Sequence, residues 1–206
     1  METFIYTSKN VLSPELCNKW IDTFNKSEVK TPGVTSSGED DGKKSTDITL
    51  NPSFKNHPEW KPLLDQTIPL VKKHQKIYQD KYMNFLAFNS IRNETINYRI
   101  FREDGLKIYP HFNIQHYKPG EGFYDYHCER STHQNQNRVL AWMFYLNDVT
   151  EGGGTQFYHQ NHIEKAEQGK MVIFSSEWFH AHRGVSSKTQ DKYILTGWIV
   201  LNSNKF

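Results

Sequence analysis

The sequence predicts a single domain that is mainly β, with a helical N-terminal third. The chain has 206 residues, a length typical of one domain of ~100–200 residues. From about Asn97 onward, short alternating aromatic and β-branched segments are separated by Gly, Asn and Asp, which is typical of a sandwich or barrel. Before them, apolar residues recur at helical spacing in two stretches.

The composition indicates a folded protein of nearly neutral charge. The chain has 13 Phe, 11 Tyr and 5 Trp, and such large side chains can build a core, so a disordered chain is excluded. Its 25 Lys and Arg residues against 23 Asp and Glu give a formal charge of +2. This argues against a strongly basic protein that follows nucleic-acid phosphates.

Cysteine usage and the N-terminus favour a protein of a reducing compartment. Cys17 and Cys128 are too few for a disulfide framework and are expected to be free thiols, with Cys128 packed away from any site. Residues 1–6 lack the basic and apolar regions of a signal peptide. The longest apolar run, 139–146, is far below the ~18 residues that span a bilayer. We therefore expect a cytoplasmic protein without membrane contact.

The first helix is predicted to begin after Ser13. This residue is a good N-cap, and Pro14 at the first helical position needs no hydrogen-bond acceptor. The apolar face consists of Leu16, Trp20, Ile21 and Phe24. A polar loop, 30–44, follows, and loops of that length are either functional lids or simply mobile. By length and position, residues 30–47 are a possible lid over the substrate.

A second helix is predicted from near Glu59. Pro69 should kink or split it, and its continuation toward Tyr82 and Phe85 is left open. The apolar stripe consists of Trp60, Leu63, Leu64, Ile68 and Val71. Residues 1–96 would thus form a helical support for a β core over 97–206. The predicted strands of that core are 108–117, 124–129, 138–146, 155–159, 170–174 and 193–201.

The segment 124–129 carries the first candidate metal ligands. In a strand, residues two apart point to the same face, so His127 and Glu129 would project together. One imidazole and one carboxylate are two thirds of a 2-His-1-carboxylate triad, which leaves open positions on Fe(II). Asp125 would share that face and is the alternative carboxylate, although its order is reversed relative to the triad pattern.

A second segment supplies the remaining candidates. His180 and His182 both suit a third metal ligand, since both would face one side of a strand. Lys192 follows His182 by ten residues, amid apolar neighbours. A buried lysine needs an anionic partner, such as the far carboxylate of a dicarboxylate cosubstrate.

Taken together, the stretch from about Gln115 to Val200 resembles the iron- and 2-oxoglutarate-dependent dioxygenases, specifically the prolyl 4-hydroxylase-like branch. The resemblance depends on several motifs in the right order. These are Tyr117 with Gly120, His127-x-Glu129, Glu151-Gly152-Gly153-Gly154-Thr155-Gln156-Phe157, Gly169-Lys170, His182-Arg183-Gly184 and Lys192-Tyr193-x-x-x-Gly197-Trp198.

The resemblance implies a double-stranded β-helix (jelly roll) that uses Fe(II), 2-oxoglutarate and O₂. By position, His127, Glu129 and His182 would be the catalytic iron ligands. Lys192 would pair with the distal carboxylate of 2-oxoglutarate. The other cosubstrate residues would be Tyr117 and Thr155, which hydrogen-bond near that carboxylate, and Trp198, which lines the pocket.

The sequence departs from this family at one ligand. The family usually has Asp two residues after the first His, whereas this chain has Glu129, whose side chain is one methylene longer. We expect iron binding to be retained, because the charge and the oxygen donors are kept. The retained carboxylate also argues against a halogenase. For the third ligand, the resemblance favours His182 over His180 because of the interval to Lys192 and the following Arg183-Gly184.

The implied activity is hydroxylation of an unactivated C–H, of a prolyl residue in a peptide or of a free amino acid. An oxidative nucleic-acid demethylase is disfavoured by the charge of +2. A metal-binding jelly roll without turnover, serving as a binding module, is the alternative from another class. It is disfavoured because Lys192, Tyr117 and Trp198 together make a cosubstrate pocket that such a module does not need.

Overall fold

The computed structural model describes residues 2–35, 38, 41–83 and 105–202. The helices are α1 (Pro14–Lys26) and α2 (Lys61–Tyr82), with a 3₁₀ turn, η1 (Pro52–Asn56), between them. The strands of the first half are short: β1 (Tyr6–Ser8), β2 (Thr31–Pro32), β3 (Lys43–Lys44) and β4 (Thr46–Leu50). Those of the second half are β5 (Leu106–Tyr117), β6 (Gly122–Phe123), β7 (Arg138–Tyr145), β8 (Thr155–Phe157), β9 (His162–Glu164), β10 (Met171–Ser175), β11 (His182–Gly184) and β12 (Lys192–Leu201).

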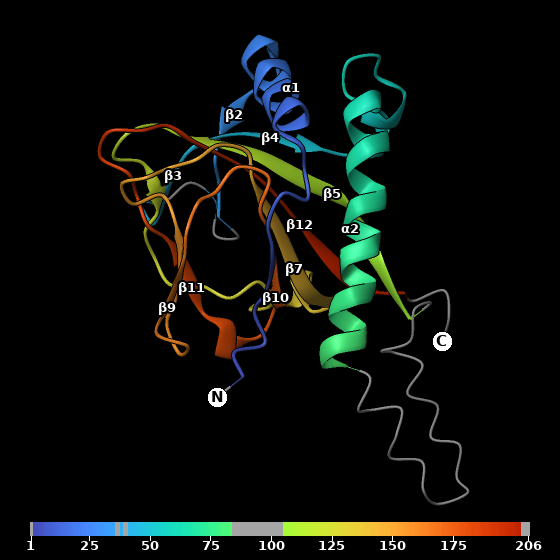
Figure 1. Cartoon of the computed structure of the whole chain (residues 1–206), viewed down its shortest axis with the longest axis vertical. Coiled ribbons are helices and arrows are strands. Elements are labelled where there is room, and N and C mark those ends of the chain that lie inside the picture. Colours follow the sequence, from blue (N-terminus) through green and yellow to red (C-terminus); the bar gives the residue numbers. More distant parts are fainter. Residues whose placement is uncertain (1, 36–37, 39–40, 84–104, 203–206) are drawn as a thin grey trace, which may run out of the picture.

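The described strands form one large and two small antiparallel sheets. The large sheet has seven strands in the order β1-β10-β7-β12-β5-β4-β2, and the small ones are β11-β8-β9 and β3-β6. Figure 1 shows α1 and α2 on one side of the large sheet and the strands β9 and β11 on the other. Two sheets facing each other, with helices behind one of them, are the predicted jelly roll.

The central strand β7 is buried on both faces, which explains its continuous apolar sequence. Alternate residues of a strand point to opposite faces. Trp142 and Phe144 belong to the core beneath the helices, whereas Met143 and Tyr145 belong to the core between the sheets. Hydrophobic packing therefore holds β7 in place from both sides, and its inner residues are fixed beside the space between the sheets.

The helix α1 begins as the sequence predicts. The Ser13 hydroxyl accepts a hydrogen bond from the Leu16 N–H at 3.2 Å, and Pro14 opens the helix. The indole N–H of Trp20 donates to the Thr67 hydroxyl of α2 at 3.0 Å. Trp20 also packs against Phe112 of β5, with ring centroids 6.4 Å apart, so one buried residue ties both helices to the sheet.

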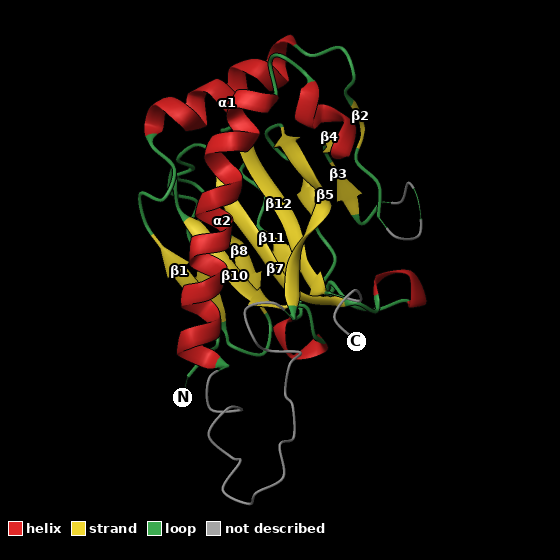
Figure 2. Ribbon diagram, turned by 90° about the vertical axis from the view of Figure 1, so that its right-hand side faces the viewer, coloured by secondary structure: helices red, strands yellow, loops and turns green. Residues whose placement is uncertain are grey.

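The helix α2 is not split at Pro69. The sequence predicts a kink or a split there, and the split does not occur. The helix runs unbroken from Lys61 to Tyr82, packed along the large sheet (Figure 2). Pro69 lies on the exposed side, where water can satisfy the carbonyl that loses its helical partner. Val71 and Tyr78 on the opposite side are buried, and their packing holds the helix together. The residue Phe85 lies outside the described residues.

The prediction of a helical N-terminal third was incomplete, because β1, β2 and β4 join the large sheet. These strands are short. The partners of β1 and β4 are β10 and β5, which come more than sixty residues later, and β2 pairs only with β4, so local pattern does not reveal them. Within the possible lid, Val34, Thr35 and Lys43 line the cavity between the sheets. A lid function stays a prediction, and residues 36–37 and 39–40 lie outside the described residues.

Five of the six predicted β segments are strands, and their boundaries are shifted by up to two residues. They correspond to β5, β7, β8, β10 and β12. The sixth, 124–129, is wrong: β6 ends before it at Phe123, and within it the chain has only a single bridge, between His127 and His182. Neither described helix is long and apolar enough to cross a membrane.

Candidate metal centre

Two histidines from distant parts of the chain meet in the cavity between the sheets. The backbones of His127 and His182 exchange both of their hydrogen bonds, at 3.0 and 2.9 Å. This pairing brings the two imidazole rings to a centroid distance of 4.4 Å. Phe123 of β6 stacks on the His127 ring, with centroids 3.7 Å apart and planes 11° apart. Backbone pairing and ring stacking therefore orient these imidazoles before any ligand binds.

Each imidazole has Nδ1 against a backbone carbonyl and Nε2 turned toward Glu129. Nδ1 of His127 lies 3.1 Å from the Asp125 carbonyl, and Nδ1 of His182 lies 2.9 Å from the His180 carbonyl. A carbonyl only accepts, so Nδ1 donates and Nε2 is the nitrogen available to a metal. Burial, together with the neighbouring His182, lowers the pKa of His127 to about 4. That ring is therefore neutral at pH 7, the form that binds metals.

Glu129 completes the group. Its Oε1 lies 3.9 Å from Nε2 of His127 and 3.5 Å from Nε2 of His182. Among the described residues, these three are the one cluster of His, Cys, Asp or Glu whose ligand atoms all lie within 4.8 Å of one another. Burial alone would raise the pKa of Glu129, but the contacts with His182, His127 and Trp198 outweigh it and lower the pKa to about 2. The carboxylate is therefore ionised.

The extra methylene of Glu129 is accommodated by two partners on its other oxygen. The Trp198 indole N–H donates to Oε2 at 2.7 Å, and the Arg138 guanidinium lies 3.4 Å from the same atom. Arg138 in turn lies over the Trp198 ring, 3.5 Å from its centroid. This stack fixes Oε2 and leaves Oε1 facing the histidines. Arg138 was missed by the sequence analysis, because nothing in its spacing links it to the candidate ligands.

The alternative ligands are not part of this cluster. His180 is fully buried, accepts from the Ser175 N–H at 3.0 Å and has Nε2 2.8 Å from the Thr3 carbonyl. Both of its nitrogens are engaged, so His180 has a structural role. Asp125 borders the cavity and contributes its carbonyl to orienting His127. Cys128 also lines the cavity, which contradicts the expectation that it packs away from the site. That expectation assumed a regular strand, which the chain does not form there.

A buried cation without a partner lies across the same cavity, whose volume is about 590 Å³. The side chain of Lys192 is 5% exposed, and burial lowers its pKa to about 8. Its ammonium lies 4.5 Å from the Tyr117 ring centroid, and the described structure gives it no hydrogen bond or carboxylate. A Cβ added to Gly184 would come within 3.5 Å of this ammonium. The glycine therefore leaves room for an anion beside Lys192.

The other predicted cosubstrate residues lie in two different settings. Thr155 and Trp198 line the cavity. Tyr117 is buried beneath Lys192, and its hydroxyl donates to Gln115 at 2.8 Å. Tyr145, which the sequence analysis missed, shares a 2.7 Å hydrogen bond with the Thr155 hydroxyl. Its position in a long apolar strand made it look like a simple core residue.

Two imidazoles and one carboxylate suit Fe(II) with open positions, and the unpartnered Lys192 suits the far end of a dicarboxylate. Residues 112–200 match the family model of the 2OG-Fe(II) oxygenase superfamily. The chain carries a 2OG-Fe(II) oxygenase domain. The family model covers the motifs between Gly120 and Trp198 on which the resemblance depends. Fe(II), 2-oxoglutarate and O₂ are therefore the cofactor and cosubstrates of this oxygenase.

Solved structures show that the oxygenase has the prolyl hydroxylase fold. A viral collagen prolyl hydroxylase from Paramecium Bursaria Chlorella virus-1, in complex with 2OG, is 17% identical, with 96% of each chain covered and a TM-score of 0.60. A Pseudomonas putida prolyl-4-hydroxylase is 16% identical, with 97% of this chain and 93% of that chain covered and a TM-score of 0.64. A Trichoplax adhaerens prolyl hydroxylase, in complex with a hypoxia inducible factor peptide fragment, is 13% identical. The match covers 98% of this chain and 86% of that chain, with a TM-score of 0.68. No curated protein matches the sequence.

Proposed function

We propose that this oxygenase hydroxylates a prolyl residue within a peptide. His127, Glu129 and His182 hold Fe(II), and Lys192 holds the distal carboxylate of 2-oxoglutarate. The observation that carries the proposal is that one cavity contains both the convergent ligand atoms, within 4.8 Å of one another, and the buried, unpartnered lysine. A binding module would have no use for this lysine.

The residues of the chain prepare the site for coupled oxidation. Bound Fe(II) with 2-oxoglutarate supplies the activation of O₂ that couples decarboxylation to succinate and CO₂ with C–H hydroxylation. Carbonyls hold Nδ1 of both imidazoles, which leaves Nε2 of each ring for the metal. Trp198 and Arg138 hold the second oxygen of Glu129, so Oε1 is the atom that would face the metal. Lys192 would set the orientation of the cosubstrate, since its charge lies in the cavity beside Tyr117.

The substrate class follows from the neighbours and from the shape of the site. The solved proteins of this fold include prolyl hydroxylases, one of them in complex with a peptide. The cavity of about 590 Å³ also accommodates more than the cosubstrate. Asp125 and Cys128 on one side and Val34 and Thr35 on the other border it. A free amino acid is the second candidate, and a comparison of free proline with prolyl peptides distinguishes the two.

An anaerobic titration tests the iron site and the cosubstrate site together. Metal-free protein receives Fe(II) and then 2-oxoglutarate, and the measurement is the visible charge-transfer band that appears when the keto acid chelates iron. We expect the band in the parent protein and in Lys188→Ala, whose exposed lysine lies outside the cavity. The band should be weakened in Glu129→Ala and in Lys192→Ala.

The outcomes separate the proposed function from its alternatives. A folded parent protein without the band would contradict an active oxygenase and favour the metal-binding module. A normal band, followed by oxygen transfer to a methylated nucleic acid but to no peptide, would favour the demethylase. A mass increase of one oxygen on a proline-containing peptide, absent when alanine replaces that proline, would support the prolyl hydroxylase.

A further inference from the structure

A second cavity lies on the helix side of the large sheet, between α2 and the first half of β5. Its volume is about 490 Å³. The strand β4 pairs with β5 only from Phe112 to His116, and the cavity occupies the space beside β5 beyond the end of β4. We call this cavity the α2–β5 groove. Figure 2 shows α2 running along the large sheet.

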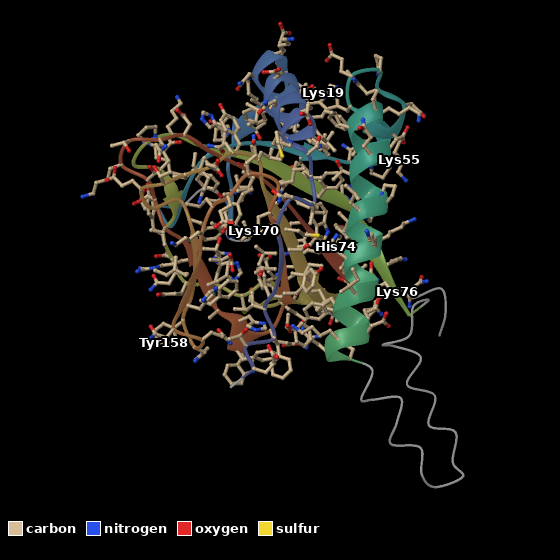
Figure 3. All side chains as sticks on the ribbon, viewed as in Figure 1. Lys19, Lys55, His74, Lys76, Tyr158 and Lys170 are labelled. Atoms are coloured by element: carbon tan, nitrogen blue, oxygen red, sulfur yellow. The ribbon has the colours of Figure 1, made fainter. Side chains whose placement is uncertain are left out.

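The groove has an apolar floor and a uniformly positive rim. Leu64 and Ile68 of α2 face Leu106, Ile108 and Phe112 of β5 across the floor. Every charged residue among the described residues that line the groove is a lysine, although the whole chain carries a formal charge of only +2. These lysines are Lys55, Lys72, Lys76 and Lys107. Figure 3 shows Lys55 and Lys76 on the same side of the molecule, along α2.

The groove and the metal-centre cavity lie on opposite faces of β5 and share one lining residue. Tyr109 of β5 lines both, and its ring packs edge-on against Trp198, with centroids 6.3 Å apart. Trp198 in turn donates to the Glu129 carboxylate. The edge of β5 that β4 leaves uncovered is therefore the place where an extended chain could pass from the groove to the cavity.

The groove suits an extended chain better than a compact ligand. Among the described strands, β12 pairs with β5 on one side, and none covers residues 106–111 on the side where β4 ends. Pro110 in this stretch is typical of an edge strand. Exposed strand edges accept extended peptides through backbone hydrogen bonds, while neighbouring pockets select side chains. Charge complementarity then requires acidic side chains at the lysine rim.

We propose that the α2–β5 groove binds an acidic, extended segment of the peptide substrate, which flanks the prolyl residue that enters the metal cavity. This inference rests on the proposed function and names its specificity: the oxygenase selects peptides with Asp and Glu residues on one side of the target. The recognition is electrostatic at the rim and apolar at the floor.

Two adjacent lysines of α2 provide the test and its control. Lys72 and Lys73 are both exposed, but only Lys72 lines the groove. A fluorescein-labelled acidic peptide without proline is titrated with the full-length protein, and binding is followed by anisotropy. We expect Lys72→Glu to raise the Kd about fivefold to tenfold, because attraction at the rim becomes repulsion, while Lys73→Glu changes it less than twofold. Circular dichroism confirms that both variants fold.

This measurement is independent of the proposed reaction, since the peptide has no proline and needs no iron. Equal effects of Lys72→Glu and Lys73→Glu, or equal binding of acidic and basic peptides, would overturn the groove assignment. Displacement of a fluorescent fatty acid from the groove, without discrimination among peptides, would also overturn it in favour of an anionic amphiphile. Absence of the charge-transfer band would instead contradict the proposed function and leave the binding result standing.

Steady-state kinetics with prolyl peptides then test whether the groove contributes to hydroxylation. With prolyl peptides that carry acidic, neutral or basic flanks, we expect the acidic flank to give the lowest KM. Lys72→Glu should raise this KM and leave kcat unchanged, because Lys72 does not touch the reacting atoms. An effect on kcat with unchanged KM would contradict a role in substrate binding.

Discussion

The metal-centre cavity and the α2–β5 groove both carry charge, but they hold it in opposite ways. In the cavity, the candidate ligands are oriented by fixed partners: carbonyls for His127 and His182, and Trp198 for Glu129. In the groove, three of the four lysines are exposed, and one of these, Lys76, lies 3.5 Å from Asp80. A buried, preorganised group fixes the geometry of a reaction, whereas an exposed lysine attracts many related ligands with modest strength.

The largest effect is expected from removing the carboxylate ligand. Glu129→Ala should lower the affinity for Fe(II) by more than about a hundredfold, because changes to outer partners of a metal ligand already cost about 10–100-fold. Isothermal titration of metal-free protein with Fe(II) under anaerobic conditions measures it. Glu129→Asp is the informative companion. If it binds iron as well as the parent does, the contacts of Glu129 with Trp198 and Arg138 do not determine the position of the carboxylate.

Next in size is the loss of the buried cation. A charge-assisted hydrogen bond in such a site contributes about 1.5–3 kcal/mol. We therefore expect Lys192→Ala to weaken 2-oxoglutarate binding by about 10–150-fold with little change in Fe(II) affinity. The midpoint of the charge-transfer titration measures the first quantity, and iron titration without cosubstrate measures the second. Equal losses in both would mean that the variant disturbs the whole cavity.

The same lysine predicts a pH dependence. Burial lowers the pKa of Lys192 to about 8, and a bound carboxylate would raise it again. Binding of 2-oxoglutarate is therefore at full strength below pH 8 and takes up a proton above it, so the affinity falls by up to about tenfold per pH unit as the pH rises further. Titrations between pH 7 and 9.5 measure this. Lys192→Arg, whose charge persists at these pH values, should lose the dependence.

A smaller effect is expected at the stack that holds Glu129. Replacing Arg138 with Gln removes the guanidinium 3.4 Å from Oε2 and its packing on Trp198, but the indole hydrogen bond remains. The Fe(II) affinity should fall about tenfold, at the low end of the range for outer partners of a metal ligand. Unchanged iron binding with a raised peptide KM would mean that Arg138 serves the substrate rather than the ligand.

The smallest expected effect is that of salt concentration on ligand affinity, which should differ between the two regions. At ~1 M salt the Debye length is about 3 Å, against about 10 Å at ~0.1 M, and buried pairs are screened much less than exposed ones. Binding of the acidic peptide should weaken several-fold over this range, whereas 2-oxoglutarate binding should change less than about twofold. Parallel titrations at the two salt concentrations check this. A peptide affinity as insensitive as that of 2-oxoglutarate would mean that the groove lysines do not contribute.

Local chemistry made much of the architecture predictable. Ser13 and Pro14 define the start of α1, and the run from Leu140 to Tyr145 is apolar throughout because both of its faces are buried. By contrast, β1 and β4 were missed because each is stabilised by a strand far away in the sequence. Pro69 also did not interrupt α2, since tertiary packing outweighs a local preference.

The sequence by itself determined which residue types are available for the site: the spacing of His127, Glu129, His182 and Lys192, and the resemblance that their order carries. The resemblance favoured His182 over His180, and the tertiary structure adds a physical reason, because both nitrogens of His180 are engaged by Ser175 and Thr3. The positions of Arg138 against Glu129, and of four lysines around one groove, depend on strands and helices that meet across the fold. Such contacts carry no periodic signal along the chain, so only the folded molecule reveals them.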